Sequence, residues 1–480
     1  MFGPPSRSQA GIQPTRMFSS IRTLDISIVL IGLIFAWRFF RRTRRTAPFP
    51  PGPRRTPSYR NLLDMPPQKE GLPSLNGGKN MATSHQFQFL IRKALFTRIG
   101  HLSRWGELVG WKHSLGLMPY GARLRNQRRL AHQLLGNNAA IKQFLPMVEL
   151  ETHRFLKRIS DKPDELPAYI RKTAGAIILQ ISHGYTIQEE NDPFFLVNLI
   201  PTLRHVPEWL PGAGFKRTAR EWASTLSDFV ERPHTYVKQQ MAAGNARPSF
   251  TSSQLEGGVS AEDESDIKWL AGSLYAGGAD TTVSSIYAFF KAMVLYPEVQ
   301  AKAQAEIDAV IGDHRLPRFD DRERLPYVNA LVLEVTRWHS VGPTGIAHCA
   351  SEDDVQFGYF IPKGTVILAN IWKMLHDPTV YNEPFKFNPD RFIRTDNKES
   401  ELDPYKIAFG FGRRICPGKV LADASIFISC AMVLAVFDIS KYSENGIVFE
   451  PDTEHTAGTI SHPSPFKCTI KARQEGIGAY

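Results

Sequence analysis

Apolar side chains recur at helical spacing along much of the chain. Between residues 140 and 240 they stand at positions i, i+3 and i+4, which places them on one face of an α-helix. A second pattern runs from about Ser260 to Tyr296, with a capping-box signature at Ser260 and Asp263 and a proline, Pro297, directly after it. At about 1.5 Å per residue, one helix of this length would be on the order of 50 Å long. These patterns predict a mainly α-helical protein.

Short runs rich in β-branched and aromatic residues predict small β-sheets beside the helices. Val355–Phe360 and Thr365–Ile371 are separated by a proline- and glycine-containing turn at residues 362–364, so we expect them to form a hairpin. Near the C-terminus, Ile447–Phe449 and Phe466–Ile470 have the pattern of a closing β-pair. The predicted fold class is therefore mainly α with small β-sheets.

The N-terminal region carries a separate signal. Ile26 to Trp37 is almost wholly apolar, but it is shorter than the roughly 20 residues that span a bilayer comfortably, so a signal peptide competes with an anchor. No small-x-small cleavage site follows, and the basic block Arg41–Arg45 should stay cytoplasmic. Both features favour an uncleaved anchor, with Met17 as an alternative start. We divide the chain into an N-terminal leader at 1–23, a transmembrane signal anchor at 24–40, a basic and proline-rich hinge at 41–57 and one large domain at 58–480.

The net charge and the cysteine spacing indicate which binding partners and which redox environment the protein has. The 480 residues include 58 lysines and arginines against 47 acidic residues, a net charge of +11. No basic run carries interleaved aromatics in a nucleic-acid pattern, so a membrane surface or an acidic protein partner is favoured over nucleic acid. The four cysteines show no C-x-x-C pair and no zinc spacing, which favours reduced thiols in a protein that faces the cytosol. They are Cys349, Cys416, Cys430 and Cys468.

The strongest chemical signal surrounds Cys416. A mostly apolar segment, Lys419 to Phe437, follows it and predicts a buried helix, so the cysteine stands at a helix N-terminus. Backbone N–H groups and the helix dipole favour a thiolate there. Glycines before it let the backbone approach a large flat group, and an arginine two residues earlier offers a cation to an anionic group. The motif Phe-x-x-Gly-x-Arg-x-Cys-x-Gly is formed by Phe409, Gly412, Arg414, Cys416 and Gly418.

This motif resembles the haem-ligand loop of cytochromes P-450. Pieces at residues 183–185 and 211–216 are similar to a fungal microsomal subgroup of O-methylsterigmatocystin oxidoreductase-like monooxygenases. The resemblance implies the cytochrome P-450 fold, haem as cofactor, and Cys416 as the thiolate ligand of the haem iron within a cofactor-binding loop. It runs from about Pro50 to Lys471 and is interrupted at Gly71–Trp105, where the first β-sheet of the family is shortened or replaced.

A second candidate site lies in the middle of the long predicted helix. Two glycines at 277 and 278 cost roughly 1 kcal/mol each against alanine in a helix interior, and Asp280 and Thr281 are costly in an apolar helix unless paired. Strain and polarity at one place indicate a site, although a helix crossing at small residues is the alternative. The resemblance implies that Thr281 holds a proton-delivering water and that Asp280 feeds protons to it.

Two further cofactor contacts follow from the resemblance. Arg125 belongs to a basic stretch that mostly predicts a solvated helix face, but relatives use an arginine here on a haem propionate. Leu124 replaces their tryptophan, so one hydrogen bond to that propionate is missing. His348 aligns with a His or Arg that binds the second propionate, whereas on its residues alone it is more typical of an ordinary surface or packed histidine.

Glu334 and Arg337 stand three residues apart on a predicted helix and would contribute little as a surface pair. The resemblance implies that Arg391 joins them in a buried structural triad behind the haem.

The sequence thus predicts a monooxygenase that activates O2 and oxidises a small apolar substrate in fungal secondary or xenobiotic metabolism. We expect a monomer in the endoplasmic reticulum membrane, facing the cytosol, with electrons from NADPH–cytochrome P-450 reductase. Basic Lys406, Arg413 and Lys419 would dock that reductase. Two alternatives stay open: a redox-neutral isomerase or dehydratase on the same fold, and a defective non-enzymatic variant. The second depends on whether the Gly71–Trp105 interval is a gene-model error.

Overall fold

The computed structural model describes residues 109–184, 215–312, 314–456 and 458–473. The predicted leader, anchor and hinge lie outside these residues, as does the Gly71–Trp105 interval. The chain divides into two compact units, and the described residues 353–361 belong to the smaller one. Apart from the hairpin within residues 353–361, the description below concerns the larger unit.

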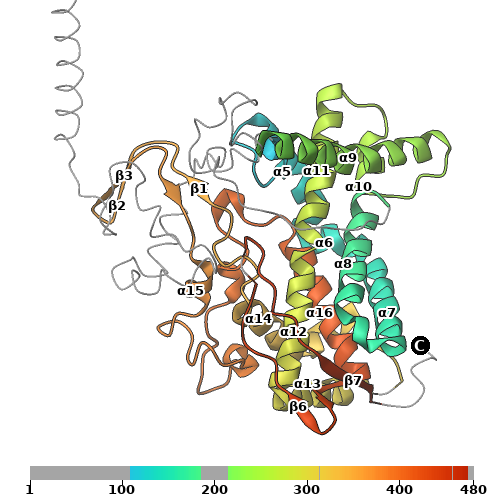
Figure 1. The fold of residues 1–480 in the computed structure, drawn as a ribbon, viewed down its shortest axis with the longest axis vertical. Coiled ribbons are helices and arrows are strands. Elements are labelled where there is room, and N and C mark those ends of the chain that lie inside the picture. The colour runs from blue at the N-terminus through green and yellow to red at the C-terminus, as the bar shows by residue number, and fades with distance from the viewer. Residues whose placement is uncertain (1–108, 185–214, 313, 457, 474–480) are drawn as a thin grey trace, which may run out of the picture. The chain divides into compact units, whose positions relative to one another are not determined.

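Helices dominate the described residues, as the apolar periodicity predicts (Figure 1). The α-helices are α5 (Ala122–Leu135), α6 (Asn138–Ile141), α7 (Leu145–Asp161), α8 (Leu166–Ser182), α9 (Phe215–Ala242), α10 (Phe250–Leu255), α11 (Ala261–Gly278), α12 (Thr281–Leu295), α13 (Pro297–Ile311), α14 (Pro326–Trp338), α15 (Ile371–Leu375) and α16 (Lys419–Val436). Short 3-10 turns connect them: η4 (Trp111–His113), η5 (Lys142–Phe144), η6 (Pro163–Glu165), η9 (Phe319–Arg324), η10 (Pro389–Phe392), η11 (Pro404–Lys406) and η12 (Gly412–Arg414).

The helix predicted from Ser260 to Tyr296 is two helices. Ser260 caps the first, α11, by accepting from the backbone N–H of Asp263. Regular helix stops at Gly278 and resumes at Thr281 as α12, and the two helices follow one another along a nearly common direction (Figure 1). The prediction of one continuous helix is therefore wrong at the glycine–acid–hydroxyl segment, because glycine favours local departures from the helical ladder.

Helix α16 is the centre of the main hydrophobic core. It packs against α7, α12, α13 and α14, and Phe427 and Leu434 are fully buried. Burial of such side chains stabilises the fold by roughly 1.5–3 kcal/mol each. Among the described residues it is also the one helix long and apolar enough to cross a membrane, but 72% of it is buried inside the protein. This burial is typical of the core helix of a globular domain.

Within the described residues, the strands form three small antiparallel sheets, whose pairing differs from the predicted one. β2 (Asp354–Gln356) pairs with β3 (Tyr359–Ile361), while β1 (His348–Cys349) pairs with β4 (Val366–Ile367). The predicted hairpin between Val355–Phe360 and Thr365–Ile371 is therefore wrong. Phe357 and Gly358 have φ of 50° and 80°, the left-handed pair of a two-residue hairpin turn, so the first run folds back on itself.

The C-terminal sheet has a central strand that the sequence reading missed. β5 (Phe437–Glu444) pairs with both β6 (Ile447–Phe449) and β7 (Cys468–Ala472) in the order β6-β5-β7. The two runs predicted to pair with each other are thus held apart by β5. Strand β5 begins directly where α16 ends, so an apolar run that looked like one helix changes to a strand at Phe437.

Candidate active site

The Cys416 loop is a tight turn between η12 and α16. The backbone N–H of Cys416 donates to the carbonyl of Phe409 at 2.8 Å, which closes the loop over the glycines. Gly410 and Gly412 have φ of 75° and 57°, the left-handed region that favours glycine. Phe411 anchors the loop in a small apolar cluster with Ile407 and Ile371. Glycine at position 412 of the motif, and at 410 before it, is therefore favoured by the backbone conformation of this turn.

The environment of the Cys416 sulfur combines opposing effects. Backbone N–H groups of Gly418 and Lys419 bond towards it and lower its pKa, as a helix N-terminus should, and the Arg128 guanidinium acts in the same direction. Desolvation by surrounding protein is larger, and the net effect raises the pKa of the thiol. The predicted effect of the helix N-terminus is therefore present, but in the protein alone desolvation outweighs it. Cys416 nevertheless remains solvent-accessible.

Two arginines lie beside this loop. Arg128 of α5 donates from Nη2 to the carbonyl of Ile415 at 3.1 Å, and Arg414 donates from Nη2 to the carbonyl of Met118 at 3.0 Å. Desolvation, and next the charge of Arg128, lower the pKa of Arg414 to about 10. Desolvation and the charge of Arg414 also lower the pKa of His348 on β1. These three side chains form a basic group that would be stabilised by an anion.

Arg125 is placed differently from Arg128. It is exposed, and its guanidinium carbon lies 5.6 Å from the centroid of the Tyr120 ring. The Tyr120 hydroxyl also accepts from Arg413 Nη1 at 3.0 Å. Leu124 is buried in the main core and offers no hydrogen-bond donor. Among the basic residues of α5, Arg128 is the one for which the described structure gives a bond to the Cys416 loop, and the contact of Arg125 with a haem propionate stays a prediction.

The junction of α11 and α12 has two different glycines. A methyl group at Gly278 would lie 3.0 Å from Cγ1 of Ile178 on α8, so this glycine serves a close helix crossing. A methyl group at Gly277 would meet no described atom within 4 Å, so this glycine borders open space. The Thr281 hydroxyl donates to the Gly277 carbonyl at 2.6 Å. The helix-crossing alternative is thus confirmed for Gly278, whereas the functional-site interpretation of this segment stays a prediction.

Asp280 is paired with a residue from the distant C-terminal loop. Its Oδ2 lies 3.1 Å from Nε2 of His462, and this contact is the first cause of its lowered pKa. Desolvation opposes the shift, and the charge of Arg171 adds to it. The carboxyl group therefore favours its ionised form and can accept a proton.

Comparison with protein-family models identifies the family of this chain, because the cytochrome P-450 model matches residues 100–470. The chain belongs to the cytochrome P-450 family. Its relatives include cytochrome P-450 monooxygenase 208 of Postia placenta, 45% identical over 496 residues and covering 96% of this chain and 96% of that protein. Cytochrome P-450 monooxygenase claR of Ampulloclitocybe clavipes is 41% identical over 504 residues, covering 97% of this chain and 94% of that protein. The recognised fungal P-450 monooxygenase family is confirmed.

A solved structure supports the fold. A zebra fish cytochrome P-450 with abiraterone has a TM-score of 0.65 and 21% identity, and the match covers 82% of this chain and 93% of that one. The alignment with the Postia protein spans 496 positions, more than the 480 residues here, so that relative carries internal residues without a counterpart in this P-450.

As a P-450 the chain binds haem through a cysteine thiolate, and the described residues fit that cofactor. Cys349 and Cys430 are buried, and burial raises the pKa of Cys468 to about 12. Cys416 is accessible, stands in a loop with space-making glycines, and has cationic Arg128 and Arg414 at its side. An iron ion would supply the positive charge that a desolvated thiolate needs.

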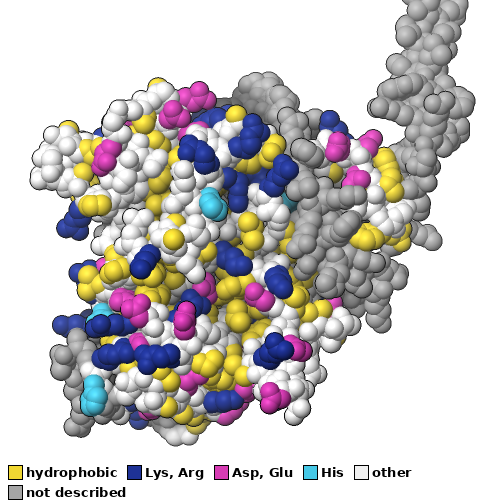
Figure 2. Space-filling view, turned by 180° about the vertical axis from the view of Figure 1, so that it is seen from behind, with side chains coloured by type: hydrophobic (Ala, Val, Ile, Leu, Met, Phe, Trp, Pro, Cys, Tyr) yellow, Lys and Arg dark blue, Asp and Glu magenta, His cyan; other side chains and the backbone are white. Residues whose placement is uncertain are grey.

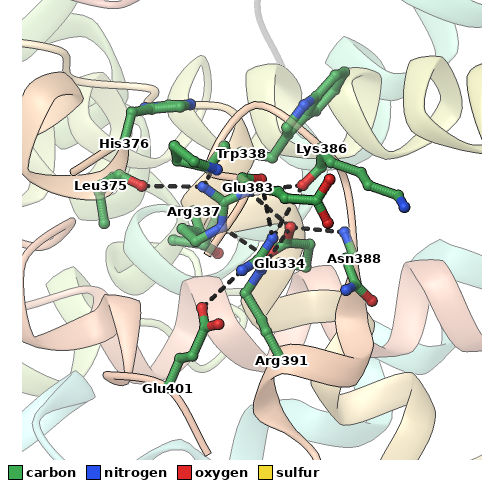
Figure 3. Close-up of polar contacts among 12 residues, drawn as sticks. Glu334, Arg337, Trp338, Leu375, His376, Glu383, Lys386, Asn388, Arg391 and Glu401 are labelled. Atoms are coloured by element: carbon green, nitrogen blue, oxygen red, sulfur yellow. Dashed lines mark hydrogen bonds and ion pairs between the residues drawn. The ribbon is translucent and has the colours of Figure 1, made fainter. Parts of the chain in front are cut away.

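The predicted triad forms a buried polar cluster (Figure 3). Arg337 donates to both carboxylate oxygens of Glu334 at 2.7 Å, and Arg391 Nε lies 3.1 Å from the same carboxylate. Arg391 also donates to Glu401 at 2.7 Å. Carbonyls of residues 375, 382, 384 and 386 accept the remaining guanidinium hydrogens. All three side chains of the triad are essentially buried, so the surface-pair alternative is wrong for this P-450.

Two residues of this site were missed from the sequence, Arg128 and His462. Arg128 carried a weak signal, because it lies on the same basic stretch as Arg125. His462 carried none, since it is separated from Asp280 by 182 residues.

Proposed function

We propose that Cys416 is the axial haem ligand and that the enzyme hydroxylates or otherwise oxidises a small apolar substrate with O2. The observation that carries this assignment is that Cys416, an exposed residue, stands in the motif loop bordered by Arg128 and Arg414. When bound, thiolate-ligated haem supplies reductive O2 activation, in which electron density from sulfur favours O–O cleavage.

The chain's residues would divide the remaining work. Arg414 and His348, joined by Arg128, would hold the anionic propionates, and Arg125 at the exposed edge is a further candidate. Phe409, Gly412 and Gly418 would fix the shape of the ligand loop. Together with the ligand Cys416, these residues make up the proposed haem-binding set.

Proton handling falls to the α11–α12 junction. The Thr281 hydroxyl already donates to the Gly277 carbonyl beside open space, so it can hold a water there. Asp280 is ionised and 35% exposed, which allows it to take a proton from outside and pass it inward. This acid–hydroxyl pair favours O2 activation over a redox-neutral rearrangement.

Electrons would come from NADPH–cytochrome P-450 reductase, with the enzyme anchored in the endoplasmic reticulum membrane through residues 24–40 and facing the cytosol. Figure 2 shows basic side chains spread over one face among fewer acidic ones, which suits an acidic partner. Lys406 and Arg413 are exposed, whereas Lys419 lies over the Tyr405 ring at 5.3 Å. Lys406 and Arg413 are therefore the better docking candidates. A role in secondary or xenobiotic metabolism and a monomeric state belong to the same proposal.

The test is the carbon monoxide spectrum of the reduced, purified protein. The unaltered protein should show the red-shifted Soret band of a thiolate ligand and consume NADPH when reductase is added. Cys416→Ser should lose both, because serine offers no thiolate. Cys468→Ser, which changes a cysteine on β7 far along the chain, is the matched control and should keep them. An unchanged spectrum and turnover in Cys416→Ser would refute the ligand assignment.

A further inference from the structure

Asp280, the N-cap residue of α12, and side chains on one face of this helix all bind the same C-terminal loop, residues 452–456 and 458–466. Asp280, Ser284, Tyr287 and Lys291 follow the spacing i, i+4, i+7 and i+11, which places them on one side of a helix. Ser284 donates to the Ser461 carbonyl at 2.5 Å, and the backbone N–H of Phe466 donates to the Tyr287 hydroxyl at 3.1 Å. The loop is therefore held along the helix at several points.

The far end of this row is buried. Lys291 is 2% exposed, and its Nζ lies 3.2 Å from both Oδ1 of Asp452 and the carbonyl of Glu454. A buried ammonium group is stable only with such partners, so these contacts fix the loop strongly. At the other end, the same loop presents His462 to Asp280. The position of His462 is thus set by a series of contacts and not by one flexible side chain.

The charged surroundings of the Asp280–His462 pair come from several elements. Arg171 of α8 acts on Asp280, and Lys291 and His462 both act on His339 of α14. His339 packs against His455 with ring centroids 5.5 Å apart, and burial lowers the pKa of His339 to about 3, so it stays neutral. In contrast, the His462 side chain is 20% exposed, so its ring is in contact with solvent.

We propose that His462 is a positioning residue for proton delivery: it holds Asp280 in place and passes solvent protons to it. The inference deepens the proposed function and rests on it. A proton leaves Nε2 of the imidazolium for Oδ2 of Asp280, which leaves a neutral imidazole and a neutral carboxylic acid. Asp280 then gives that proton to the water held by Thr281 and is a carboxylate again. The imidazole regains a proton from a hydronium ion of the solvent, which leaves water. Only N–H and O–H bonds change, and the net result is one proton moved from solvent to the water at Thr281.

The experiment compares His462→Gln with the matched control His455→Gln in the full-length holoenzyme. The glutamine side chain can still donate an N–H hydrogen bond to Asp280, but it stays neutral at every pH of the experiment. Histidine ordinarily changes its charge between pH 5 and 8. The probe is 7-ethoxycoumarin with NADPH and reductase, and the readouts are peroxide released per NADPH from pH 5 to 8, the carbon monoxide spectrum, and amide hydrogen exchange of residues 458–466.

For His462→Gln we expect an unchanged carbon monoxide band and unchanged hydrogen exchange. Peroxide per NADPH should rise by about threefold to tenfold and lose its pH dependence, a smaller effect than the roughly hundredfold contribution of a direct acid–base group. His455→Gln should match the unaltered enzyme. A His462→Gln enzyme with the unaltered pH profile and peroxide yield would overturn the inference, as would one whose only change is faster hydrogen exchange. Absence of the thiolate band in the unaltered protein would instead overturn the proposed function, and the inference with it.

Discussion

At the scale of single residues, competing electrostatic effects decide the state of the site. The helix N-terminus and Arg128 favour the Cys416 thiolate, while desolvation favours the thiol and is larger. Arg414 is likewise desolvated, with a second cation beside it. A sulfur and two guanidinium groups in such surroundings are costly alone and would be stabilised together by an iron porphyrin with anionic propionates. On the proposed assignment, the cofactor would remove these unfavourable contributions to the free energy.

This argument predicts that Arg128→Leu weakens haem retention. The substitution removes a charged hydrogen bond to the Ile415 carbonyl and a cation near the sulfur. Charged hydrogen bonds contribute about 1.5–3 kcal/mol, so haem affinity should fall by roughly tenfold or more. The haem-to-protein ratio after gel filtration measures it. Arg129→Leu is the control, because Arg129 is exposed and bonds only along its own helix to Asn126 and Gln133 among the described residues. Equal haem loss in both variants would contradict the prediction.

At the scale of elements, the break between α11 and α12 positions the two residues proposed to deliver protons, Asp280 and Thr281. The Thr281 hydroxyl donates a hydrogen bond to the Gly277 carbonyl. Asp280 lies between the two helices as the N-cap residue of α12. A continuous helix would bury its polar groups against its neighbours. The interruption instead leaves a hydroxyl and a carboxylate partly exposed at one point of an otherwise apolar helix pair. Glycine makes this possible on one side and permits the close contact with α8 on the other.

The two glycines should therefore respond differently to alanine. In Gly278→Ala the new methyl group would lie 3.0 and 3.2 Å from the Cγ1 and Cδ1 atoms of Ile178. Overpacking of this kind costs about 1–3 kcal/mol, of which up to about 1 kcal/mol is offset by helix propensity. Gly277→Ala should keep its stability and haem content, since its methyl group would meet no described atom within 4 Å. Midpoints of urea unfolding compare the two, and a less stable Gly277→Ala would refute the packing argument.

At the scale of the whole molecule, Glu334 joins segments that are distant in sequence. It binds Arg337 on its own helix, Arg391 on η10 and the backbone N–H of Asn388. Arg337 in turn donates to the carbonyl of Leu375, the last residue of α15. The irregular stretch between α15 and the Cys416 loop has few helices or strands to hold it. Its backbone carbonyls are hydrogen-bonded instead by the buried guanidinium groups of Arg337 and Arg391, as the carbonyls of a strand would be by a neighbouring strand.

Glu334→Gln should destabilise the protein by roughly 3–5 kcal/mol, because it leaves two buried guanidinium groups without their shared carboxylate. Glu399→Gln is the matched control. Glu399 pairs with Arg394 at 2.9 Å, but both side chains are more than 70% exposed, so its loss should cost less than about 1 kcal/mol. Urea unfolding measures both changes. Similar effects in the two variants would show that the cluster is not a structural centre.

Local residue patterns determined the mainly helical class, the cap at Ser260, the cysteine motif and the positions of the glycine–acid–hydroxyl segment. They did so because helical periodicity, capping and tight turns depend on residues within a few positions of each other. The P-450 family followed from the same local motif. What such patterns could not provide was the partner of each strand, since a short run can pair with any edge that the fold brings to it.

Only the tertiary structure decided which charged groups meet. Arg128 contacts the loop 287 residues further on, and His462 reaches back 182 residues to Asp280. The raised pKa of Cys416 also belongs to this level, because desolvation depends on all the atoms packed around the sulfur. The sequence by itself determined which chemical groups this enzyme has. Long-range packing determined their partners, and with them their charge and their access to solvent.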